Sequence, residues 1–284
     1  MAANNATLCF PDSKKTCFAC CPPIRPAHYE HIQHRTSVQR ILRENTSDFD
    51  TRRREGRPIT GYSCWALGYL DEDGRLVGCL LHPAQNRGED LRDRVDYGNK
   101  CRRETCPEAK VFSMLNPEEK IFWLHMADGL NAFSYSSRKH NPLFTMMKWG
   151  DPVLGVIAAK DSGPRMTWPD FLDRYPFFST GVSPKGNAYL LNRLIKGKTV
   201  LRLRNRAFRQ EFEAFSETIR ERVKMEFTPS GDGHPVHRLD LDRHFLDFLR
   251  LSANIQRIHR QQALRIKEMV DQELESLWKR KSEN

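Results

Sequence analysis

Eight cysteines lie within the first 106 residues of this 284-residue chain, and the rest of the chain contains none. Two groups are tight, Cys17-x2-Cys20-Cys21 and Cys101-x4-Cys106. Thiols this dense oxidise or cross-link unless a metal or disulfides engage them. A Cys-x2-Cys pair in a turn lets two thiolates reach one metal, and four thiolates suit tetrahedral zinc or an iron–sulfur cluster. The spacing therefore predicts a metal centre, with disulfides or redox-reactive thiols as the alternatives.

We expect one centre, with ligands from a set of seven cysteines: Cys17, Cys20, Cys21, Cys64, Cys79, Cys101 and Cys106. Cys9 lies in a polar tail ahead of the cluster and is the cysteine we expect not to be a ligand. Eight thiols exceed the four that a single site needs, so two centres, or thiols with a structural role, stay open. Spacing does not choose between zinc and iron–sulfur. The high thiol count and the lack of paired histidines favour iron–sulfur.

The histidines near the cysteines are weaker candidates. His82 follows Cys79 by three residues, but a surface position beside Pro83 explains it as well. Three more recur every third residue, which fits a polar helix face better than a ligand set: His28, His31 and His34.

The cysteine-rich part resembles the bacterial YkgJ-like family, which is described as chelating zinc or iron. The resemblance runs from Cys9 to Lys110 and is carried by four segments: Cys17-x2-Cys20-Cys21, Cys64, Gly78-Cys79-Leu80-Leu81-His82-Pro83 and Lys100-Cys101-Arg102-x3-Cys106. It implies a metal centre, zinc or a cluster such as [4Fe–4S], and no particular reaction. The chain departs from the family in its leading cluster, and His82-Pro83-Ala84 replaces an Arg-Pro element.

Composition indicates a globular protein, with 39% hydrophobic and 29% charged residues. The longest apolar run, 153–159, is too short to span a bilayer. The first residues lack the basic and apolar regions of a secretory signal. We therefore expect a cytoplasmic protein, a location that disfavours structural disulfides.

The net charge of +10 leaves a nucleic-acid partner open. Under this alternative a structural zinc would fold the first domain, and a basic stretch would contact phosphates: Arg202, Arg204, Arg206 and Arg209. Interleaved glutamates make a solvated helix face the simpler interpretation. A disulfide-stapled exported domain is the third hypothesis, and an unidentified protein partner is left open.

We expect two domains and an α+β fold: a cysteine-cluster metal-binding domain over 1–110 with a short hairpin, and a mainly helical domain of unassigned role over 111–284. Large apolar residues make up roughly a fifth of the first part and roughly a third of the second. A unit so poor in core residues commonly needs a metal or disulfide to stay folded.

In the first part we expect a helix over 27–45 and two strands, 62–70 and 75–81, joined by an acidic, Gly-containing turn at 71–74. This hairpin would carry Cys64 on its first strand and Cys79 near the end of its second. The polar stretches 46–58 and 85–99 are expected to be irregular.

In the second part, Asn116-Pro117-Glu118-Glu119 predicts a helix start, and that helix should run to about residue 133. Apolar residues at three- and four-residue spacing predict a helix over 205–227. After a break at 228–233, we expect one long helix over 240–279.

Overall fold

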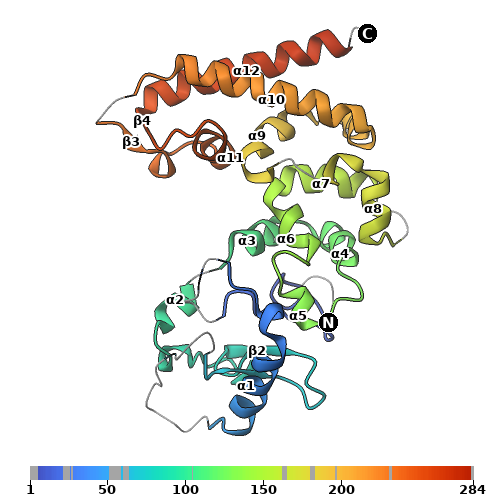
Figure 1. Ribbon diagram of the computed structural model, residues 1–284, viewed down its shortest axis with the longest axis vertical. Helices are drawn as coiled ribbons and strands as arrows, with labels where there is room; N and C mark the ends of the chain where they lie inside the picture. Colours follow the sequence, from blue (N-terminus) through green and yellow to red (C-terminus); the bar gives the residue numbers. More distant parts are fainter. Residues whose placement is uncertain are drawn as a thin grey trace. The chain divides into compact units, whose positions relative to one another are not determined.

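The computed structural model describes residues 6–21, 26, 28–50, 59, 64–103, 105–161, 165–179, 183–195, 197–229 and 232–282. These residues form twelve α-helices and two small antiparallel sheets (Figure 1). The fold is therefore mostly helical and consistent with the α+β class. In the described part of the chain, no helix has the length and apolar character needed to cross a membrane.

The chain divides into two compact units, Met1–Thr145 and Met146–Asn284. The elements of the first unit, in chain order, are α1 (Arg35–Ser47), β1 (Leu67–Tyr69), β2 (Val77–Cys79), α2 (Gly98–Arg103), α3 (Pro107–Met114), α4 (Pro117–His125) and α5 (Ala132–Tyr135). Helix α6 (Pro142–Met146) spans the division. The second unit contains α7 (Asp151–Lys160), α8 (Trp168–Arg174), α9 (Pro184–Leu194), α10 (Arg206–Glu226), β3 (His234–Pro235), α11 (Arg243–Asp247), β4 (Arg257–Ile258) and α12 (Arg260–Ser282).

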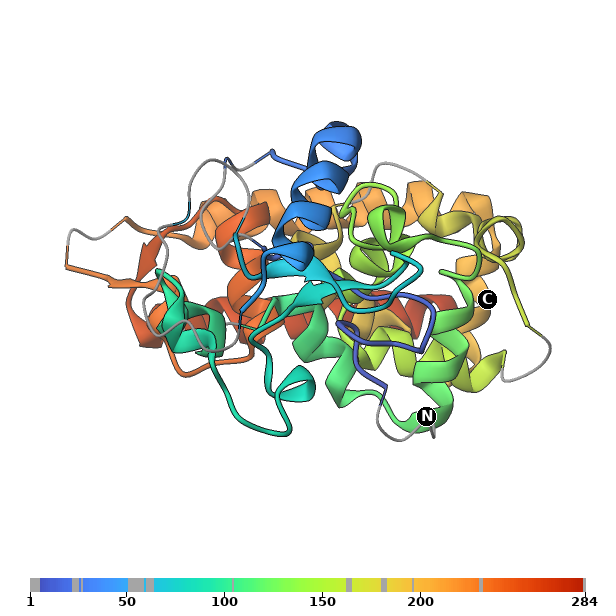
Figure 2. The same cartoon turned by 90° about the horizontal axis from the view of Figure 1, so that it is seen from below.

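The predicted hairpin of the first unit is confirmed. Strands β1 and β2 pair antiparallel with Leu67 opposite Cys79. The Asp71 carboxylate closes the turn by accepting from two backbone N–H groups, those of Arg75 at 2.8 Å and Leu76 at 2.7 Å. The strands are shorter than expected, so Cys79 ends β2 but Cys64 lies just before β1. Helix α1 packs against β1 (Figures 1 and 2).

Helix α1 begins later than predicted. The turn before it, η2 (His31–His34), is a 3₁₀ helix, and the regular helix starts at Arg35. The start of the predicted range, Ala27, lies outside the described residues. The predicted irregular stretch 85–99 contains short 3₁₀ turns and the first residues of α2.

The N-terminal segment 6–21 is tied to distant parts of the first unit. The buried Thr16 hydroxyl donates to Val77 O at 2.6 Å and accepts from Val77 N at 2.9 Å, so it extends the edge of β2. The backbone N–H of Phe18 donates to Ser136 Oγ at 2.9 Å, and the Tyr135 hydroxyl donates to Leu8 O at 3.0 Å. Because 132–137 thus packs with the N-terminal segment, the division falls after Thr145 and not at the expected 110/111 boundary.

The predicted start of α4 is confirmed, and its predicted length is wrong. Asn116 and Glu119 form a reciprocal capping box with Pro117 in the first turn. The helix ends at His125, well before residue 133. Gly129 has a φ of 81°, which breaks the helical path, and Asn131 then caps α5.

In the second unit, α10 confirms the predicted amphipathic helix. Its buried side chains recur at three- and four-residue spacing: Phe208, Phe212, Ser216, Ile219 and Val223.

The expected single helix over 240–279 is wrong. Helix α11 passes into a π-helical turn, η9 (Phe248–Ser252), and Asn254 then takes a φ of 57°. Strand β4 pairs with β3, placing Ile258 opposite His234, before α12 begins at Arg260. Phe245, Phe248, Ile258 and Ile266 are buried, as the pattern predicted, but they come from four elements (α11, η9, β4 and α12) in place of one helix.

Two buried tyrosines of the second unit predict an alkaline loss of stability. Burial, and then the hydrogen bond to the Asp161 carboxylate, raise the pKa of Tyr175 to about 12. Burial and Asp271 also raise the pKa of Tyr189. A raised pKa stabilises the folded state while the phenol stays neutral, so this contribution is complete below about pH 10, the unfolded value, and is lost as pH rises toward 12.

We therefore expect the urea midpoint of the second unit to fall between about pH 10 and 12. The Tyr175→Phe variant should show a shallower fall over the same range. Equal slopes for the variant and the parent protein would show that Tyr175 does not titrate with a raised pKa.

Candidate metal centre

The N-terminal segment positions the first cysteines. The backbone N–H of Cys17 donates to Cys9 O at 2.9 Å, which ties Cys9 to the cluster. A turn closed by Cys21 N and Phe18 O, 3.0 Å apart, carries Cys20 and Cys21. Phe18 anchors this turn because its ring is buried and packs edge-on against Phe133. Cys9, predicted to be outside the site, therefore lies beside Cys17.

The hairpin positions Cys64 and Cys79. The carbonyl of Cys64 accepts from Leu67 N and from Asn45 Nδ2, both at 3.0 Å. Cys79 lies across the ladder from Leu67. Cys64 belongs to the hydrophobic core of this unit, and Cys79 and Cys21 pack against the same core. Three cysteines that are distant in sequence thus share one apolar environment.

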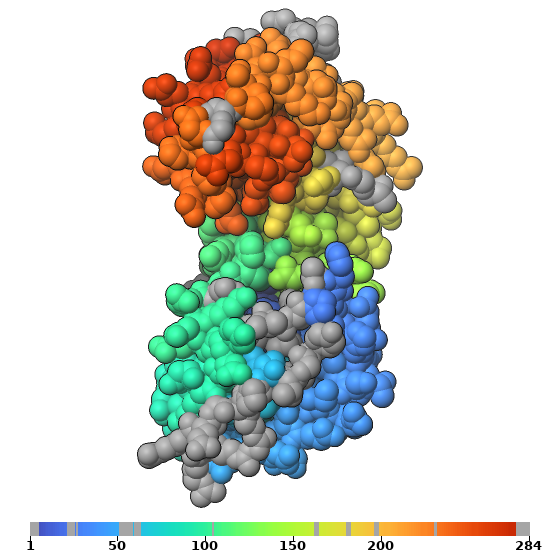
Figure 3. Space-filling model, turned by 60° about the vertical axis from the view of Figure 1, so that its left-hand side comes forward, coloured from blue at the N-terminus to red at the C-terminus, as the bar shows by residue number. Residues whose placement is uncertain are grey.

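Short helices position the last two cysteines. Cys101 lies on α2, where the Arg92 guanidinium donates to its carbonyl at 3.0 Å. Cys106 is the N-cap of α3, and its Sγ accepts from Ala109 N at 3.4 Å. Figure 3 shows the segment around α2 and helix α1 on one face of this unit, with part of the hairpin between them.

The position of α2, and with it that of Cys101, depends on a close backbone contact at Gly98, the first residue of the helix. A Cβ at Gly98 would lie 2.1 Å from Arg92 O and 2.8 Å from Asp93 Cα, both backbone atoms that cannot rotate away. Gly98→Ala should therefore lower the free energy of unfolding by about 1–3 kcal/mol. The neighbouring exposed Asn99→Ala should change it by less than about 0.5 kcal/mol. Equal urea midpoints for the two variants would contradict the close approach.

Backbone N–H groups point at four of the sulfurs from two or three residues further on. Their partners are Ala19 for Cys17, Ala66 and Leu67 for Cys64, Leu81 for Cys79, and Ala109 for Cys106. Each such bond lowers the pKa of its thiol because it stabilises the thiolate. Hydrogen bonds to sulfur also tune iron–sulfur clusters. The local backbone is thus suited to thiolate ligands.

Burial raises the pKa of these thiols by more than the hydrogen bonds lower it. It raises the pKa of Cys9 and Cys64 to about 12 and that of Cys79 to about 11. The pKa of Cys17 is raised well above its ordinary value, chiefly by burial, and that of Cys21 chiefly by the Cys20 thiol. These thiols are protonated at neutral pH, which argues against their being activated nucleophiles. A bound cation would deprotonate them.

The sulfurs do not form a ready-made coordination shell. Among the described residues, which include all eight cysteines, no three Cys, His, Asp or Glu side chains are placed to hold a metal ion. All eight cysteines are thiols in the structure. Protonated thiols gain little by converging, whereas a cation attracts thiolates, so binding would require the side chains to close around the metal.

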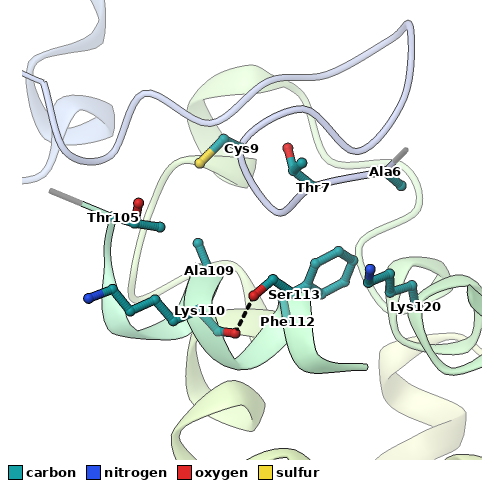
Figure 4. Close-up of a pocket in the computed structure, with 9 residues that line it drawn as sticks. All are labelled: Ala6, Thr7, Cys9, Thr105, Ala109, Lys110, Phe112, Ser113 and Lys120. Atoms are coloured by element: carbon teal, nitrogen blue, oxygen red, sulfur yellow. Dashed lines mark hydrogen bonds between the residues drawn. The ribbon is translucent and has the colours of Figure 1, made fainter. Parts of the chain in front are cut away.

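A cavity of about 700 Å³ lies beside Cys9 and the start of α3 (Figure 4). Cys9 is exposed there, although the surrounding protein removes enough water to raise its pKa. Thr105 and Ala109, which flank Cys106, line the same cavity, and so do the two cations Lys110 and Lys120. This side of the cysteine cluster is therefore open to small solutes.

The nearby histidines make other contacts. The buried His31 hydrogen-bonds the carbonyl of Cys21 through Nε2, and its Nδ1 lies 3.3 Å from the Tyr29 hydroxyl. His34 stacks on Tyr29, and His82 Nδ1 accepts from Ala84 N at 3.2 Å. These contacts leave sulfur as the better donor type for a metal.

The basic stretch of the second unit makes intramolecular contacts. Arg202 lies over the Phe208 ring, 4.9 Å from its centroid, and pairs with Glu211. Arg204 pairs with Asp161 at 2.8 Å, and Arg209 pairs with Glu213 at 3.1 Å. Three of the four arginines thus form ion pairs within the protein. The net charge is therefore the one observation that supports the nucleic-acid hypothesis.

No protein-family model, curated protein or solved structure matches this chain. The resemblance to the YkgJ-like family therefore depends on the cysteine motifs alone.

Proposed function

We propose that this chain is a metal-binding protein whose N-terminal unit holds an iron–sulfur cluster, or zinc, through its cysteines. One observation carries the proposal: all eight cysteines lie in the first unit as free thiols, and Cys21, Cys64 and Cys79 share one apolar environment. Such an environment disfavours isolated thiolates and suits thiolates neutralised by a metal. Membership of the first unit in the YkgJ-like family is part of the same proposal.

We favour iron–sulfur over zinc because the donor set is all sulfur. The histidines beside the cysteines are engaged elsewhere, and backbone N–H groups are directed at Cys17, Cys64, Cys79 and Cys106. When bound, a cluster would supply one-electron transfer, which fits a redox or modification role. The protein's residues would hold the cluster and tune its potential through these N–H···S bonds. Zinc in a four-thiolate site would be structural, because it has no open position.

Spectra of protein purified without oxygen distinguish the two metals. An iron–sulfur protein should be brown, with broad absorbance near roughly 400 nm that is bleached by dithionite. A colourless protein with bound zinc would exclude the cluster but keep the metal-binding proposal. A colourless protein without metal would contradict the proposal itself.

A further inference from the structure

We propose that the cavity beside Cys9 binds a small organic dianion, a molecule with an anionic group at each end of an apolar body. The cavity has a volume of about 700 Å³ and lies within the first unit. This volume is in the range of pockets that hold small-molecule ligands. The inference goes beyond the metal-binding proposal and does not depend on it, because it concerns the charges and the space around Cys9 and no metal ligand.

The lining of the cavity combines apolar surface with two positive charges. Helix α3 forms one wall, and the N-terminal segment lies across the cavity from it (Figure 4). Ala109 and the ring of Phe112 lie between the two lysines in this view. The described lining residues are Ala6, Thr7, Cys9, Thr105, Ala109, Lys110, Phe112, Ser113 and Lys120.

The charged side chains of this lining are both cationic. Lys110 and Lys120 form no ion pair with any carboxylate that the structure describes. The acidic residue of α3, Glu108, is buried and pairs with Arg138 at 3.4 Å. The carboxylate of Glu119 accepts from Asn116 N at 2.8 Å, in the capping box of α4. Neither acid is part of the lining, so the cavity keeps its positive charge.

The two lysines enter the cavity from different helices. Lys110 is exposed on α3, whereas Lys120 on α4 is half-buried, with Nζ 5.9 Å from the centroid of the Phe112 ring. Figure 4 shows their ammonium groups on opposite sides of the cavity. A compact anion would contact one lysine at a time, whereas an elongated dianion can contact both. The apolar surface between the lysines would contact its uncharged middle.

Hydroxyl groups can supply further hydrogen bonds to an anion. Thr7 Oγ1 accepts from Phe10 N at 2.9 Å, and its O–H can donate to a ligand. Thr105 is exposed and can donate in the same way. The Ser113 hydroxyl already donates to Lys110 O at 2.7 Å (Figure 4). Ammonium and hydroxyl donors of this kind bind carboxylate and phosphate oxygens.

Calorimetric titration of the full-length protein with two six-carbon acids tests the charge pattern. Adipate carries a carboxylate at each end, and hexanoate carries one. Adipate should bind with a dissociation constant of about 1 mM or lower. Hexanoate and inorganic phosphate, a compact anion, should each bind at least about fivefold more weakly. No saturable adipate binding, or equal affinity for adipate and either comparison anion, would overturn the proposal.

Substitutions in the lining test the site itself. Lys110→Gln and Lys120→Gln should each weaken adipate binding by about fivefold or more. The matched control is Lys139→Gln, which removes an exposed lysine of the same unit that is not in the lining, and it should bind adipate like the parent. Ser113→Phe should abolish binding without any change of charge, because the ring would occupy the cavity.

Far-UV circular dichroism checks that each variant folds. Adipate binding that persists in the double variant K110Q/K120Q would overturn the role of the lysines. Binding that persists in Ser113→Phe would show that adipate contacts the outer surface and would overturn the cavity as its site. These outcomes leave the metal-binding proposal intact, because metal content and spectra test that proposal separately.

Discussion

Removing metal from the anaerobically purified protein should lower hydrogen-exchange protection in the β1–β2 hairpin and in residues 6–21 by at least about 100-fold. Thiolate–metal bonds are absent in the unfolded chain, so their free energy adds directly to folding. The segment 6–21 contributes the Thr16 and Phe18 hydrogen bonds that hold it to Val77 and Ser136. Without metal, the loss of these cross-links should open this region first.

Helix α10 provides the internal reference for this measurement. It belongs to the second unit, which contains no cysteine, and it is stabilised by its own buried phenylalanines. Its amides should exchange at the same rate with and without metal. Mass-spectrometric hydrogen exchange of the full chain reports both regions in one experiment. Unchanged protection in the hairpin would show that metal does not support the fold of the first unit.

Replacing Asp161 with alanine should lower the free energy of unfolding of the second unit by about 3 kcal/mol. The Asp161 carboxylate is 2% exposed and is paired with Arg174 at 2.6 Å and Arg204 at 2.8 Å. It also accepts from the buried Tyr175 hydroxyl. The substitution leaves all three partners without their acceptor. Both arginines are partly exposed, so water can solvate them when the carboxylate is removed. The expected loss in the free energy of unfolding is therefore at the lower end of the range for buried ion pairs.

Asp173→Ala is the matched control, because Asp173 is an exposed carboxylate on α8, the same helix as Arg174. Its urea midpoint should match that of the parent within experimental error. A double-mutant cycle with Arg204→Ala should give a coupling energy of at least about 0.5 kcal/mol. A loss at Asp161 no larger than that at Asp173, or a cycle with no coupling, would refute the role of this carboxylate.

Local signals in the sequence predicted the elements they control. The Asn116 capping box, the Asp71 turn and the apolar spacing of α10 each lie within a few residues, and each appears as expected. The hydrophobic pattern after Asp240 identified buried residues correctly but not their conformation. The π-helical turn and the positive φ of Asn254 lead into β4, which pairs with β3, a strand more than 20 residues earlier in sequence.

Long-range contacts set the arrangement of the cysteines, and no local sequence pattern predicts these contacts. The Thr16–Val77 bonds join residues 61 apart in sequence, and the Phe18–Ser136 bond joins residues 118 apart. These bonds bring the N-terminal segment to the hairpin and to α5. The tie between Cys9 and Cys17 is a backbone bond, which the identity of neither residue could predict. Sequence therefore identified the cysteines as candidate ligands but not which of their thiols are neighbours.

The most direct test is elemental analysis of the full-length protein purified without oxygen, with acid-labile sulfide and native thiol titration on the same sample. We predict bound iron with matching sulfide, or bound zinc in the alternative form, and thiols that become titratable only after the metal is removed. A native protein that contains no metal and has eight titratable thiols would contradict the account.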